Sequence, residues 1–98
     1  MNNQTSTYLI TGAAGFIGSN LINKILKLCN SHIRVIGIDN LNNYYDIKLK
    51  EYRLSKLSKF ERFEFIKCDI SNKDKMEKIF EIYNPKVVIN LAAQAGVR

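Results

Sequence analysis

The sequence predicts an α/β fold in which a parallel sheet of about four strands, in the order 3-2-1-4, carries helices on both faces. Two observations predict it. Short apolar runs alternate with amphipathic stretches along the 98 residues, and the connections between them are short. The apolar runs are rich in β-branched residues on both faces, as strands of a buried parallel sheet are. Such alternation is typical of parallel strands joined by right-handed crossovers.

The first two strands and the helix between them are clearly marked. Residues 8–11 (YLIT) form a short apolar run that ends at Gly12, which predicts a buried strand. Across residues 16–29, apolar side chains recur at intervals of three and four, which predicts a helix with a wide apolar face. Residues 33–38 (IRVIGI) predict the second strand.

The second half of the chain continues the same alternation. Residues 47–58 predict a basic amphipathic helix, and residues 63–68 (FEFIKC) predict a third strand. Ser71 is expected to cap the next helix, with Asp74 as its capping-box partner. An Asn-Pro pair ends that helix, and residues 86–91 (KVVINL) predict a fourth strand before a loop of small residues.

Composition excludes several classes of protein. Hydrophobic residues make up 46% of the chain, but no stretch approaches the ~18 uninterrupted apolar residues of a membrane span. The N-terminus lacks the basic start and apolar core of a signal peptide. Cys29 and Cys68 have no Cys or His partner at metal-ligand spacing, so we expect reduced, packed thiols and no metal site. These features predict a cytoplasmic protein with no membrane partner.

The net charge of +6 raises the question of an anionic partner. Six basic residues cluster in one segment: Lys48, Lys50, Arg53, Lys56, Lys59 and Arg62. A solvated helix face is the main interpretation, and a surface that attracts phosphate is the alternative. No aromatic stacking platform is interleaved with these charges, so we expect no nucleic-acid partner.

The stretch TGAAGFIGSN, residues 11–20, places three glycines at intervals of three, between a predicted strand and a predicted helix. Gly12 would allow the tight exit from the strand, Gly15 the close approach of a diphosphate, and Gly18 the close packing of the helix on the sheet. Backbone N–H groups and the helix dipole favour a pyrophosphate there. A plain structural turn is the alternative.

Acidic residues follow the next two strands. Asp39 is expected to accept hydrogen bonds from the adenosine ribose and to repel a 2′-phosphate. No Lys or Arg in residues 40–47 offsets that repulsion, so NAD is favoured over NADP. Asp69 is expected at the adenine amine with Ile70 over the ring, although Asp69 could simply cap the following helix. The prediction is therefore a partial Rossmann fold that binds a dinucleotide.

Small residues follow the fourth strand. Leu91, Ala92 and Ala93 would lie across the switch point from the glycine loop and leave room for the dinucleotide backbone. Close packing alone explains the same residues.

The motifs TGAAGFIG, GIDNLNNYYD, CDI and NLAAQAGVR together resemble the extended short-chain dehydrogenase/reductase superfamily. Within it, the chain looks like the NAD-dependent epimerase/dehydratase family of nucleotide-sugar enzymes, above all the UDP-glucuronate 4-epimerases of polysaccharide biosynthesis. The resemblance implies NAD as the cofactor and a UDP-sugar as the substrate. It implies that C4 of the sugar is oxidised to a 4-keto intermediate and re-reduced on the other face. One departure is Asn90, where similar sequences carry His.

The resemblance also assigns site residues. Those implied to bind the cofactor are Gly12, Gly15, Phe16, Ile17, Gly18, Asp39, Asn40, Asp69, Ile70, Leu91, Ala92, Ala93 and Gln94. Those implied to approach the sugar are Gly96, Val97 and Arg98, because an arginine fork suits a carboxylate or a diphosphate.

The resembled enzymes use a Tyr with a Lys four residues later as their acid–base group. Two pairs match this spacing, Tyr44 with Lys48 and Tyr52 with Lys56. Both lie between the second and third strands, on the adenosine side, so we expect no catalytic residue here. We expect residues 1–98 to be the N-terminal half of an NAD-binding domain, an inactive fragment without the catalytic region and the substrate domain. A stand-alone NAD-binding or interaction module is the alternative, as is another dehydratase or epimerase of the superfamily. The exposed edge of the fourth strand is expected to promote self-association.

Overall fold

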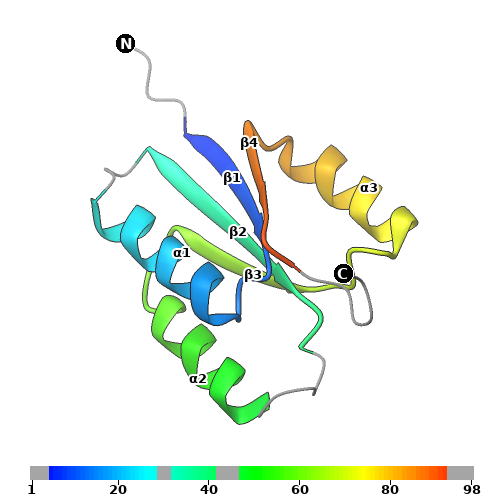
Figure 1. Cartoon of the computed structure of the whole chain (residues 1–98). Helices are drawn as coiled ribbons and strands as arrows, with labels where there is room; N and C mark the ends of the chain where they lie inside the picture. Colours follow the sequence, from blue (N-terminus) through cyan, green and yellow to red (C-terminus); the bar gives the residue numbers. More distant parts are fainter. Residues whose placement is uncertain (1–4, 29–31, 42–46, 93–98) are drawn as a thin grey trace.

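The computed structural model describes residues 5–28, 32–41 and 47–92 (Figure 1). The elements follow one another in the order β1 (Ser6–Thr11), α1 (Phe16–Leu28), β2 (Ile33–Asp39), α2 (Ile47–Leu57), β3 (Phe63–Lys67), α3 (Lys73–Tyr83) and β4 (Val87–Asn90). All strand pairs are parallel, and the sheet order is β3-β2-β1-β4. The predicted α/β fold and strand order are confirmed.

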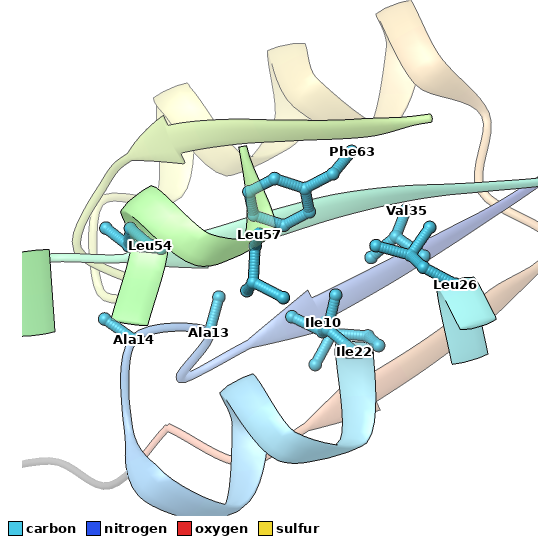
Figure 2. Close-up of a cluster of buried hydrophobic side chains, with 9 residues drawn as sticks. All are labelled: Ile10, Ala13, Ala14, Ile22, Leu26, Val35, Leu54, Leu57 and Phe63. Carbon is cyan, nitrogen blue, oxygen red and sulfur yellow. The ribbon is translucent and has the colours of Figure 1, made fainter. Parts of the chain in front are cut away.

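Helices cover both faces of the sheet. Helices α1 and α2 lie on one face, whereas α3 lies on the other (Figure 1). The face under α1 and α2 holds the larger core, drawn in Figure 2: Ile10, Ala13, Ala14, Ile22, Leu26, Val35, Leu54, Leu57 and Phe63. Under α3 the buried residues are Leu9, Ile36, Ile38, Cys68 and Ile79. Full burial of one Leu or Ile side chain stabilises a fold by about 1.5–3 kcal/mol, so these two clusters hold the layers together.

The predicted cap of α3 is wrong by one residue. Asn72 is the N-cap, and its side-chain oxygen accepts a hydrogen bond from the Lys75 N–H at 3.2 Å. Ser71 lies one residue too early, in the turn before α3, where its N–H and hydroxyl both donate to Asp69, at 2.9 and 2.8 Å. At the other end, Asn84 adopts a left-handed conformation (φ 46°) and donates its N–H to the Phe80 carbonyl, which ends the helix as expected.

A charged cluster ties the end of α3 to the sheet. Arg34 and Tyr83 both donate to the Glu64 carboxylate, at 2.5 and 2.6 Å, and the guanidinium lies 5.3 Å from the centre of the tyrosine ring. The hydrogen bond to Glu64 raises the pKa of Tyr83 above its usual value of 10.0. The cluster therefore stabilises the fold as long as the Tyr83 hydroxyl stays protonated.

The raised tyrosine pKa predicts a loss of stability in alkali. The contribution is fully present below the unfolded-state pKa of 10.0 and is lost as the pH rises through the higher folded-state value. Urea unfolding between pH 9 and about pH 11.5 should show this loss in the wild-type chain, across the tyrosine titration range. The Tyr83→Phe variant should lack the part of this stability loss that comes from Tyr83. An identical pH dependence of stability in both chains would show that Tyr83 does not cause the loss.

Candidate functional site

The predicted site residues meet at one edge of the sheet because all the strands are parallel. Gly12 follows β1, Asp39 ends β2, Asp69 follows β3 and Leu91 follows β4. Strand β1 pairs with β2 on one side and with β4 on the other, so the strand order reverses between β1 and β4. In open α/β sheets, ligands bind at the carboxyl ends of the strands beside such a switch point.

The three glycines of the loop differ in how close an added Cβ would come to neighbouring atoms. Gly12 has a φ of 73°, and a Cβ there would lie 2.8 Å from the Leu91 carbonyl carbon. A Cβ on Gly18 would lie 2.1 Å from the Gly12 carbonyl oxygen. Among the described residues, a Cβ on Gly15 would have one close neighbour, the Gly12 oxygen, at 3.3 Å. The fold itself requires Gly12 and Gly18, whereas a side chain at Gly15 meets far less of the described chain.

The start of α1 presents backbone donors. Within the described ranges, no acceptor is found for the N–H groups of Phe16, Ile17 and Gly18, as expected for the first turn of a helix. The Phe16 and Ile17 side chains are 69% and 68% exposed, so the mouth of the helix has an apolar rim. Free N–H groups together with the positive end of a 13-residue helix suit a diphosphate.

Asp39 points at the glycine loop. Its carboxylate is 5% exposed and accepts hydrogen bonds from the Ala14 N–H at 3.0 Å and the Leu41 N–H at 2.8 Å. A third donor, the Lys50 ammonium, lies 3.4 Å from Oδ1. A carboxylate has about four acceptor positions. Counting the described residues alone, one position is available for a hydroxyl group of a ligand.

Lys50 and Arg53 are the two site cations that sequence reasoning missed. Arg53 donates to the Ala14 carbonyl at 3.2 Å, and its guanidinium lies 5.8 Å from the centre of the Phe16 ring. In the sequence they belong to the basic segment, outside residues 40–47, but the fold of α2 brings Lys50 to Asp39 and Arg53 to Ala14. The spacing contained the signal: Lys50 and Arg53 stand four residues before Leu54 and Leu57, the buried residues of α2, and therefore on the same face.

The other members of the basic segment have different surroundings. Arg62 donates to the backbone carbonyls of Ile33 and Leu26, at 2.9 and 2.7 Å, and so joins α1 to β2. Lys48, Lys56 and Lys59 are exposed. The segment is thus a solvated surface in part, while Lys50 and Arg53 belong to the site.

One of the two Tyr-x-x-x-Lys matches is visible. Tyr52 is 58% exposed, and the Lys56 ammonium lies 5.1 Å from the centre of its ring. Both side chains therefore belong to the surface of α2. The Tyr44 half of the other match lies outside the described residues.

Asp69 is exposed and stabilises the turn before α3. Its carboxylate accepts hydrogen bonds from the Ser71 N–H and from the Ser71 hydroxyl. These two bonds, in that order of effect, hold the pKa of Asp69 below its usual value, and a hydrogen bond from the Asn40 side chain has a smaller effect in the same direction. The structure thus brings the Asn40 side chain to the Asp69 carboxylate. Ile70 packs against the core under α3.

Thr11 joins the glycine loop to the end of β4. Thr11 is buried, with 3% of its surface exposed. Its hydroxyl accepts hydrogen bonds from the N–H groups of Leu91 and Ala92, at 3.0 and 3.1 Å. It donates to the Asn90 side-chain oxygen at 2.5 Å. The hydroxyl therefore uses its one donor and both acceptor positions. Ala93, Gln94, Gly96, Val97 and Arg98 lie outside the described residues.

Removing this hydroxyl should loosen the junction of β1 and β4. Thr11→Val keeps the shape of the side chain but removes the acceptor described for the Ala92 N–H and the donor to the Asn90 side chain. The Leu91 N–H keeps only its longer bond to the Thr11 carbonyl, at 3.3 Å, so we expect the free energy of unfolding to fall by about 1–3 kcal/mol. Thr11→Ser should keep most of the stability, and Thr7→Val serves as the control for the same Thr-to-Val change elsewhere on the strand. Urea unfolding measures the three values. Equal stability of Thr11→Val and Thr11→Ser would contradict the role of the hydroxyl.

Among the described residues, no group of three or more His, Cys, Asp or Glu side chains is placed to hold a metal ion. None of the helices there has the length and apolar character needed to cross a bilayer.

Known proteins match this chain in sequence over most of its length. The family model for GDP-mannose 4,6 dehydratase matches residues 9–98. Protein CapI of Staphylococcus aureus is 52% identical over 90 residues, and UDP-glucuronate 4-epimerase of Thermodesulfobacterium geofontis is 48% identical over 91 residues. These alignments cover 92% and 93% of the chain but only 26% and 27% of the relatives. The chain thus spans about a quarter of the length of these curated relatives.

A solved structure gives the same result. The Bacillus cereus UDP-glucuronic acid 4-epimerase, in complex with UDP-glucuronic acid and NAD, superposes with a TM-score of 0.78 at 42% identity. The match covers 94% of this chain and 28% of that one. The resemblance drawn from the sequence motifs is confirmed: this chain belongs to the GDP-mannose 4,6 dehydratase family, within the NAD-dependent epimerases and dehydratases.

Proposed function

We propose that residues 1–98 form the N-terminal half of the NAD-binding domain of a nucleotide-sugar epimerase of the UDP-glucuronate 4-epimerase type. The observation that carries the proposal is the position of Asp39, buried and bonded to the Ala14 N–H beside the open amides of α1. That arrangement joins a ribose acceptor to a diphosphate cradle. The relative from T. geofontis and the B. cereus complex support the choice of sugar and cofactor.

The residues present fit NAD in two places, at the diphosphate and at the adenosine ribose. The N–H groups of Phe16, Ile17 and Gly18 would hold the diphosphate, with Gly15 giving it access to the backbone. The remaining acceptor position of Asp39 would receive a ribose hydroxyl. These contacts bind and orient the cofactor, and the bound nicotinamide supplies hydride acceptance and return.

The other predicted contacts complete the proposal. Asn40 joins Asp39 at the ribose, while Asp69 and Ile70 lie on the adenine side. Leu91, Ala92, Ala93 and Gln94 would flank the nicotinamide ribose, and Gly96, Val97 and Arg98 would approach the UDP-sugar. The catalytic Tyr and Lys and the substrate domain would lie in other parts of the enzyme.

Calorimetric titration with NAD, together with a turnover assay, tests this proposal. We expect saturable binding of one NAD per chain and no conversion of UDP-glucuronate to UDP-galacturonate. Binding that survives Asp39→Ala unchanged would refute the proposed site. Turnover by the 98-residue chain would refute the assignment as a half-domain without catalytic residues.

Self-association through β4 is a further part of the proposal. In the part of the sheet that is described, β4 pairs only with β1, and Val88 and Leu91 are 47% and 39% exposed. An unpaired apolar edge favours pairing with a second copy. We expect the chain to form dimers or larger species at high concentration.

A charge on this edge should oppose the association. Val88→Lys places a cation beside the unpaired edge, and sedimentation equilibrium should show a shift towards monomer. Ile82→Lys, at a residue of α3 that is 72% exposed, is the matched control. A wild-type chain that stays monomeric at high concentration, or an equal shift in both variants, would contradict association through β4.

A further inference from the structure

The positive charge of the chain is concentrated on one side of the sheet. Helices α1 and α2 and the turn that leads from α2 to β3, residues 16–28 and 47–62, hold eight lysines and arginines and two glutamates. The rest of the described chain holds six basic and six acidic residues, and α3 alone holds three of each. The layer of α1 and α2 therefore carries a charge of +6, equal to the net charge of the protein, whereas α3 on the opposite face is neutral. Residues 29–31 and 42–46 contribute one charge, that of Asp46, and so cannot cancel this excess.

Exposed lysines form the outer surface of this layer. We call them the basic face: Lys24, Lys27, Lys48, Lys56 and Lys59. Lys48 and Lys56 stand eight residues apart on α2 and therefore share one side of that helix, away from its buried residues Leu54 and Leu57. Helices α1 and α2 lie next to each other over the same core (Figure 1). The basic face is therefore spread over an area of two helices and does not follow a single line.

Large apolar side chains are exposed among these lysines. Leu49 and Tyr52 of α2 are 44% and 58% exposed, and Leu28 at the end of α1 is 80% exposed. The Lys56 ammonium lies 5.1 Å from the centre of the Tyr52 ring. Lysines with long apolar stems around exposed Leu and Tyr side chains suit a lipid headgroup layer, because the cations meet phosphates there and the apolar groups enter the interface.

We propose that the basic face is a docking surface for a leaflet of anionic phospholipids. A leaflet presents negative charge over a plane, which matches lysines spread over two adjacent helices, and it attracts each lysine that comes near. Nucleic acids are bound along grooves with stacked aromatic side chains, and they would gain nothing from exposed leucines. The contact is peripheral and differs from the sequence prediction of no membrane partner, because that prediction considers only spans and signal peptides.

Docking on this face leaves the proposed dinucleotide site accessible. Gly12 and Asp39 lie at the carboxyl edge of the sheet, whereas the basic face lies on the outer side of the helices. Lys50 and Arg53 turn inward from α2, to Asp39 and to the Ala14 carbonyl, and do not belong to the basic face. Variants of the two surfaces can therefore be tested separately.

Vesicle flotation of the full chain tests the proposal, because protein aggregates sink whereas chains bound to vesicles rise. With equal mixtures of phosphatidylserine and phosphatidylcholine, we expect the chain to float at low salt and to be released as added salt screens the charges. With phosphatidylcholine alone it should stay unbound. The double variant Lys56→Gln with Lys59→Gln should lower the partition coefficient about twentyfold, or about fivefold for each charge. Circular dichroism establishes that each variant is folded.

Two further variants separate the basic face from overall charge and from simple polyanion binding. Lys73→Gln with Lys78→Gln removes the same charge from exposed residues of α3 and should change the partition coefficient by less than about threefold. Tyr52→Gln keeps the charge but removes an exposed ring. It should weaken vesicle binding at least about threefold and leave binding to soluble polyglutamate unchanged.

Three results would overturn the proposal. The first is an equal loss in the two double variants, because net charge alone would then determine binding. The second is the absence of flotation with the anionic vesicles at low salt, or equal flotation with the neutral ones. The third is tighter binding of duplex DNA or polyglutamate than of the anionic vesicles at the same ionic strength, which would assign the face to a soluble polyanion. None of these results bears on NAD binding at Asp39.

Discussion

Replacing Gly18 with alanine should destabilise the chain by about 3 kcal/mol or more, or prevent folding, because the new methyl group meets backbone atoms that cannot move aside. The Cβ would lie 2.1 Å from the Gly12 carbonyl oxygen and 2.9 Å from the Gly12 carbonyl carbon. Relief would require α1 to separate from the end of β1, which also disturbs the core around Ile22. Urea unfolding followed by circular dichroism measures the loss.

Gly15→Ala is the matched control, since it adds the same methyl group three residues earlier. Among the described residues, that group has one close neighbour, the Gly12 oxygen, at 3.3 Å, so the free energy of unfolding should change by less than about 1 kcal/mol. The methyl group would instead occupy the space proposed for the diphosphate, and NAD affinity should fall by at least about tenfold. A stable Gly18→Ala variant, or a Gly15→Ala variant that binds NAD normally, would contradict this division of roles.

Asp39→Asn should produce the second largest effect, on both stability and binding. The amide is neutral, so it leaves Lys50 without its ionic partner, and it turns one acceptor towards the Ala14 or Leu41 N–H into a donor. We expect the free energy of unfolding to fall by about 2–4 kcal/mol, because a buried carboxylate with three partners is involved. Urea unfolding at pH 7 gives this value.

Asp69→Asn is the comparison for Asp39→Asn. Asp69 is exposed, and the donors that its carboxylate has among the described residues, at Ser71 and Asn40, are neutral. Its neutralisation should therefore change stability much less. Similar losses in the two variants would mean that burial and the Lys50 ion pair do not set the importance of Asp39.

Short-range patterns in the sequence were enough to predict the sheet. Strand order follows from alternating strands and helices, and Gly12 and Gly18 have the tight surroundings that the glycine spacing indicates. Each of these predictions depends on neighbours in sequence or on the rule that parallel strands end at one edge.

Other features depend on contacts between distant segments and could not be predicted from local windows. Lys50 and Arg53 reach the site only because Leu54 and Leu57 bury one face of α2 in the core that Figure 2 shows. The Thr11 hydroxyl finds its one acceptor, at Asn90, and its two donors, at Leu91 and Ala92, about eighty residues later, at the end of β4 and just beyond it. The cap is Asn72 and not the predicted Ser71, because α3 begins one residue later than expected, after a turn in which Ser71 bonds to Asp69.

The central claim is that the start of α1 and the end of β2 bind one dinucleotide together. Titration of the 15N-labelled chain with NAD, followed by amide NMR spectra, tests it most directly. The account predicts saturable changes that are largest at the Gly15, Phe16, Ile17 and Gly18 amides and at Asp39. A well-dispersed spectrum that does not change at millimolar NAD, or that changes only at residues of α3, would contradict it.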